Sequence, residues 1–65
     1  MIKVTHINGR AHYLAPQAIA RIDEPGASSQ WHGIRAVVRQ FDGRTIEVQE
    51  TAEDVVRELR RASML

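Results

Sequence analysis

The stretch Ile34–Gln49 constrains the fold of this chain more than any other. It consists of two runs rich in β-branched residues, joined through Asp42-Gly43. An Asp-Gly pair between two such runs is a strong hairpin signal, because glycine accepts the positive φ that a tight chain reversal requires. The stretch therefore predicts a β-hairpin, over residues 34–49.

Two pairing registers are open to this hairpin. A two-residue turn would place Arg39 opposite Ile46, which brings an arginine onto the apolar face. A three-residue loop of residues 41–43, with Gly43 left-handed, would instead place Val38 opposite Ile46. We favour the three-residue loop because it collects five apolar residues on one face: Ile34, Ala36, Val38, Ile46 and Val48.

A second hairpin is expected over residues 2–15. Apolar and polar residues alternate at its start, and it contains Asn8-Gly9, the pair most favoured in type I′ turns. A two-residue turn would place Val4 opposite Tyr13. That pair would bring an aromatic ring against a β-branched side chain, which is a favourable cross-strand contact.

The segment Gln17–Asp23 is ambiguous between a helical turn and a short strand entered through a bulge. Ile19 and Ile22 are three residues apart, and Pro16 interrupts any strand before them. We expect a turn that leads into a strand over Ile19–Asp23. The following residues, 24–33, form a loop longer than most connections in compact domains.

The C-terminal residues, about 52–63, predict an amphipathic helix. Thr51 is placed as its N-cap, with Asp54 three residues later in the acidic position of a capping box. Glu53 and Arg57 have the i,i+4 spacing of a helix-surface ion pair. The apolar residues of this segment form one stripe: Ala52, Val55, Val56, Leu59 and Ala62.

These elements predict a mainly β (α+β) fold in a single domain of residues 1–65. We expect one small twisted antiparallel sheet of four to five strands, built from hairpins 2–15 and 34–49, with the helix on one face. A chain of 65 residues buries only about 60% of its unfolded surface, and its two edge strands keep unpaired backbone groups. A homo-oligomer is therefore expected, and a different protein partner is the second possibility for covering an edge.

Composition excludes several function classes. The net charge of +1, from 9 basic and 8 acidic residues, gives no electrostatic reason to expect nucleic-acid binding. The apolar runs are far shorter than the ~20 residues that cross a bilayer, so we expect no membrane insertion. The N-terminus does not resemble a signal peptide, and the chain has no cysteine. These features predict a cytoplasmic protein without disulfides.

No residue pattern predicts catalysis, a cofactor or a metal. In the register expected for the first hairpin, His6 and His12 point to opposite faces and cannot share an ion, whereas a zinc site needs about four converging ligands. Ser28 or Ser29 with His32 lacks an orienting carboxylate and an oxyanion hole. We therefore expect a non-enzymatic protein with no catalytic, cofactor-binding or metal-binding residues.

One group of residues is a candidate binding surface: Trp31, His32, Arg35, Arg39 and Arg44. Basic side chains beside an aromatic ring could receive a phosphate or a nucleotide by charge-assisted hydrogen bonds and stacking. The ordinary interpretation is a solvated outer face, with Glu47 and Gln49 on the adjacent strand as partners. Trp31 is either part of the core or an exposed anchor for a partner.

Several segments, taken in order, resemble the FlbD/SwrD family of small flagellar-operon proteins. The resemblance lies in the opening Met1–Thr5, the Asn8-Gly9 turn, Ile19–Asp23 with Pro25 shortly after, and Gly43 followed by Ile46–Glu50. The amphipathic end, with Val55, Val56 and Leu59, is similar too. Relative to the family pattern, residues 26–33 form an insertion that carries Trp31 and His32.

The resemblance implies a small cytoplasmic accessory protein that supports flagellar motor function and swarming through protein interactions, without catalysis. The alternative is a phage or bacterial ligand-binding module that takes a nucleotide or another phosphate at residues 31–44. A binding site for nucleic acid there is a weaker form of the same alternative.

Overall fold

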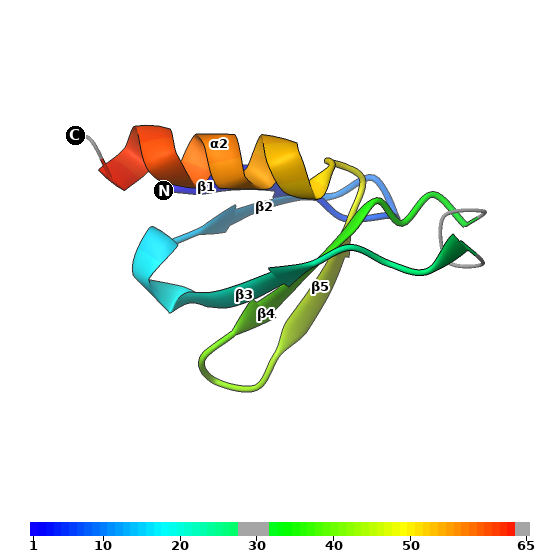
Figure 1. Cartoon of the computed structure of the whole chain (residues 1–65), viewed down its shortest axis with the longest axis horizontal. Coiled ribbons are helices and arrows are strands. Elements are labelled where there is room, and N and C mark those ends of the chain that lie inside the picture. The colour runs from blue at the N-terminus through cyan, green and yellow to red at the C-terminus, as the bar shows by residue number, and fades with distance from the viewer. Residues whose placement is uncertain (28–31, 64–65) are drawn as a thin grey trace.

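The computed structural model describes residues 1–27 and 32–63 as five strands, a 3₁₀ helix and an α-helix (Figure 1). Strands β1 (Ile2–Thr5) and β2 (Ala11–Leu14) form one antiparallel sheet. A second antiparallel sheet has the order β3-β4-β5. The bounds of its strands are Ile19–Asp23 for β3, Ala36–Gln40 for β4 and Thr45–Val48 for β5.

The expected single sheet is therefore split into two. The sheets are joined at one isolated bridge, His6 to Val48, and by the backbone hydrogen bond from Gln49 N–H to Thr5 C=O at 2.8 Å. From this junction the two sheets diverge, as Figure 1 shows. The expectation of one sheet was wrong, because pairing with β5 is confined to residues 5–7, at and just after the end of β1, and antiparallel strands this short twist strongly.

The hairpin β4–β5 has the expected register. Val38 lies opposite Ile46 and Ala36 opposite Val48. The loop is closed by hydrogen bonds from Gln40 N–H to the Arg44 carbonyl and from Gly43 N–H to the Gln40 carbonyl, and Gly43 has a φ of 89°. Burial follows the register, since Ala36, Val38 and Val48 are all inaccessible to solvent.

The register expected for the first hairpin was wrong by one residue. Val4 lies opposite His12, and Tyr13 opposite Lys3. A type I′ turn needs a positive φ at both central residues, but only Gly9 has one, at 92°. The hairpin therefore uses a three-residue loop, and Tyr13 is exposed while three apolar residues share the buried face: Ile2, Val4 and Leu14.

The segment after β2 combines the two structures that its sequence left open. Pro16–Ala18 form a 3₁₀ helix with proline in its first turn, and β3 follows directly. The pairing of β3 with β4 shifts register between Ile19 and Arg21, so a bulge does lie at the strand entry.

The helix α2 (Ala52–Ser63) closes the core formed by both sheets. Thr51 is its N-cap, since Thr51 Oγ1 accepts the Asp54 N–H at 3.1 Å. Arg57 pairs with Asp54 at 3.2 Å and not with Glu53, which corrects the expected i,i+4 pair. Val55 is buried, and the stripe residues Ala52, Leu59 and Ala62 pack against the same core.

Glu50 fastens the segment before α2 to strand β1. Its two carboxylate oxygens accept the backbone N–H of Thr5 at 2.7 Å and the hydroxyl of the same residue at 2.8 Å. These contacts are partly buried and join residues 45 positions apart in the chain. They fix where α2 begins relative to the first hairpin, and so place the groove described below.

Candidate functional site

The predicted basic residue Arg39 belongs to a charge cluster on the outer face of β3 and β4. Arg39 lies opposite Arg21 in the strand pairing. Asp23 accepts hydrogen bonds from both, from Arg39 Nε at 2.7 Å and from Arg21 Nε at 3.0 Å. One carboxylate therefore compensates two like charges that face each other across the strands. The partner of Arg39 is Asp23, and not Glu47 or Gln49 as the sequence suggested.

This cluster holds Asp23 in its charged form. The hydrogen bond from Arg39 lowers the pKa of Asp23 below its ordinary value, and the Arg21 guanidinium adds to the effect, while partial desolvation opposes it. Arg21 and Arg39 thus already hold an anionic group.

The other residues of the predicted surface lie apart from this cluster. Arg44 is at the β4–β5 loop, 83% exposed, with its Nε 3.7 Å from Asp42. Arg35 precedes β4 at the opposite end of that strand, roughly 16 Å along the chain direction from Arg44. His32 is exposed, and Trp31 lies outside the described residues, as do Ser28 and Ser29. The structure therefore does not bring Arg35, Arg39 and Arg44 together.

The histidines of the first hairpin are closer than expected. In the observed register His6 and His12 share a face, with ring centroids 5.7 Å apart, so the expectation of opposite faces was wrong. Within residues 1–27 and 32–63, no three His, Asp or Glu side chains are grouped as metal ligands.

A groove runs along the first turns of α2, where the helix faces the end of β3. We call it the α2 groove. It consists of two adjoining hollows that share Glu24, Ala52 and Glu53. The other residues that line it are Pro25, Arg35, Thr51, Val56, Arg57 and Arg60.

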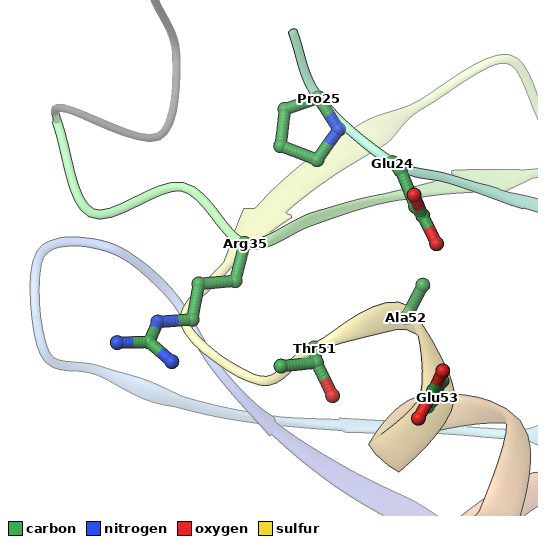
Figure 2. Close-up of a pocket in the computed structure, with 6 residues that line it drawn as sticks. All are labelled: Glu24, Pro25, Arg35, Thr51, Ala52 and Glu53. Atoms are coloured by element: carbon green, nitrogen blue, oxygen red, sulfur yellow. The ribbon is translucent and has the colours of Figure 1, made fainter. Parts of the chain in front are cut away.

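The α2 groove combines apolar surface with charges of both signs. Figure 2 shows Glu24 pointing toward Ala52 at the start of α2, while Arg35 extends on the other side of Thr51 from Glu53. Among the described residues, Arg57 is the only charged residue of the groove with an ion-pair partner. The groove therefore presents two carboxylates, of Glu24 and Glu53, and two arginines, Arg35 and Arg60, that have no ion-pair partner among the described residues, beside apolar carbon.

Sequence reasoning found Arg35 but missed the carboxylates beside it. Glu24 comes directly after β3, and Glu53 lies in the first turn of α2, so their proximity depends on how the helix packs on the second sheet. No spacing along the chain encodes that packing. The one available signal was that Glu53 falls outside the apolar stripe.

No protein-family model, curated protein or solved structure matches this chain. Nothing in these comparisons bears on the resemblance to the FlbD/SwrD family, which stays a prediction. Of the helices in the described part of the chain, none has the length and apolar character needed to span a membrane.

Proposed function

We propose that this protein is a small non-enzymatic interaction module of the cytoplasm, similar to the flagellar FlbD/SwrD proteins, that binds another protein through the α2 groove. The observation that supports this most is the lining of the groove. Apolar contact area flanked by charged side chains without internal partners is typical of a protein–protein interface with a polar rim.

The charges of the groove indicate the chemistry of the partner. Glu24 and Glu53 lie on either side of Ala52, and neither carboxylate has an ion-pair partner within the described residues. A partner segment with a lysine or arginine side chain beside an apolar residue would complement both features.

The alternative, a nucleotide or phosphate site at residues 31–44, has less support. Of its three arginines, Arg39 holds Asp23 and Arg44 lies beside Asp42. Only Arg35 has no carboxylate partner in the part of the chain that the structure describes. Titration calorimetry with ATP distinguishes the two functions: we expect no binding, and binding that Arg35→Ala abolishes at unchanged thermal stability would favour the alternative.

Gene deletion in the source organism tests the proposed role. We expect reduced swarming and reduced motor torque, both restored by the wild-type gene on a plasmid. Swimming, swarming and torque that do not change on deletion would rule out the flagellar role.

A further inference from the structure

We propose that strand β2 is a self-association edge, where β2 pairs antiparallel with β2 of a second copy of this chain. Strands β1 and β5 meet at the junction of the two sheets, which leaves β2 and β3 as the outer edge strands, each paired on one side only. Such edges carry free backbone N–H and C=O groups that can pair with another strand. This inference concerns a surface separate from the α2 groove.

The free backbone groups of β2 belong to Ala11 and Tyr13. Residues of an antiparallel strand alternately turn both backbone groups toward and away from the neighbour. The His6 N–H donates to the Arg10 carbonyl, while Thr5 uses its own backbone groups for Glu50 and Gln49 and not for Ala11. By this alternation, the backbone N–H and C=O groups of His12 and Leu14 point toward β1, and those of Ala11 and Tyr13 point outward.

The two edges differ in protection against pairing. β3 has two devices that block it: a bulge after Ile19 and charged residues at Arg21 and Asp23. β2 has no bulge, no proline and no Lys, Arg, Asp or Glu. Its sequence Ala-His-Tyr-Leu therefore leaves the edge open.

The chemistry of β2 fits a second copy. In a two-fold pairing centred on His12, Ala11 lies opposite the partner's Tyr13, so every outward N–H and C=O of the strand gains a hydrogen bond. The small Ala11 side chain leaves room for the ring of Tyr13, which is 63% exposed in the single chain.

Light scattering and amide hydrogen exchange test the proposal. We expect the mass of the wild-type protein to approach twice the 7.4 kDa of one chain as concentration rises to about 1 mM. Over the same range, exchange of the Ala11 and Tyr13 amides should slow, while that of outward amides on β3 should not change. A wild-type protein that stays monomeric, or a dimer in which these two amides exchange at the monomer rate, would overturn the proposal.

A matched pair of variants gives a second readout. Ala11→Pro removes one outward N–H without removing a bond to β1, whereas Ala11→Ser keeps the N–H at similar size. We expect Ala11→Pro to be a folded monomer by circular dichroism and Ala11→Ser to dimerise like the wild type. Dimerisation of folded Ala11→Pro would contradict the β2 interface. If Ala11→Pro does not fold, the exchange experiment on the wild type decides.

Discussion

At the scale of single residues, Glu50 is the side chain that links the most distant parts of the chain. It accepts two hydrogen bonds from Thr5 at the end of β1. Glu50→Ala leaves a partly buried N–H without its partner, and we expect a loss of about 1–2 kcal/mol in the free energy of unfolding, measured with urea. The control is Glu47→Ala, an exposed carboxylate on the outer face, which should change stability by less than about 0.5 kcal/mol. Equal effects would contradict this role of Glu50.

The charge cluster around Asp23 predicts a pH dependence. Because Arg39 lowers the folded-state pKa of Asp23 below its value in the unfolded chain, the charged form stabilises the fold above pH about 4. That contribution is lost as the pH falls through the folded-state pKa. We expect Asp23→Asn to unfold at lower urea than the wild type at pH 7, with the two midpoints converging below pH 4. A midpoint difference that is constant between pH 7 and pH 3 would show that Asp23 does not act through its charge.

At the scale of elements, the two hairpins use the same loop. In each, an apolar residue, then Asn or Asp, then Gly form the three-residue loop, and an arginine follows it. The side chains of Asn8 and Asp42 each accept the N–H of the arginine two residues later, at 2.9 Å. This similarity explains the error in the first register: the Asn-Gly pair predicts a two-residue turn, while burial of Leu14 requires the three-residue loop.

The loops predict a specific effect of replacing their glycines. Gly9 and Gly43 have φ of 92° and 89°, and a Cβ at either position would meet no atom within 4 Å. Gly9→Ala and Gly43→Ala should therefore each cost about 1 kcal/mol through backbone strain alone. Gly26→Ala is the control, because Gly26 has no positive φ; thermal unfolding in which all three variants match would contradict this explanation.

Local signals were sufficient for the elements themselves. Spacing of apolar residues predicted α2, and the apolar face of residues 34–48 selected the correct one of the two registers open to β4 and β5. The ambiguity at Gln17–Asp23 corresponded to a real 3₁₀ turn and bulge. The sequence did not predict how segments that are far apart along the chain pair with each other. The contact of His6 with Val48, which joins the two sheets, depends on strand twist and on the position of α2.

At the scale of the whole molecule, both sheets and the helix bury one small core. Side chains from β1, β2, β4, β5 and α2 contribute to it. With so few buried residues, each element depends on the others, and α2 can only lie where its apolar stripe covers the junction of the sheets. That placement brings Glu53 near Glu24 and creates the α2 groove, which could not be predicted from the sequence because no local pattern records it.

The central claim is that the α2 groove is the surface through which the protein acts. Complementation of the deletion strain with Glu24→Arg/Glu53→Arg tests it most directly, with the exposed outer-face variant Glu47→Arg as the control for charge reversal. We predict that the double variant accumulates as a folded protein but fails to restore swarming, whereas Glu47→Arg restores it fully. Full restoration of swarming by the double variant would contradict the account.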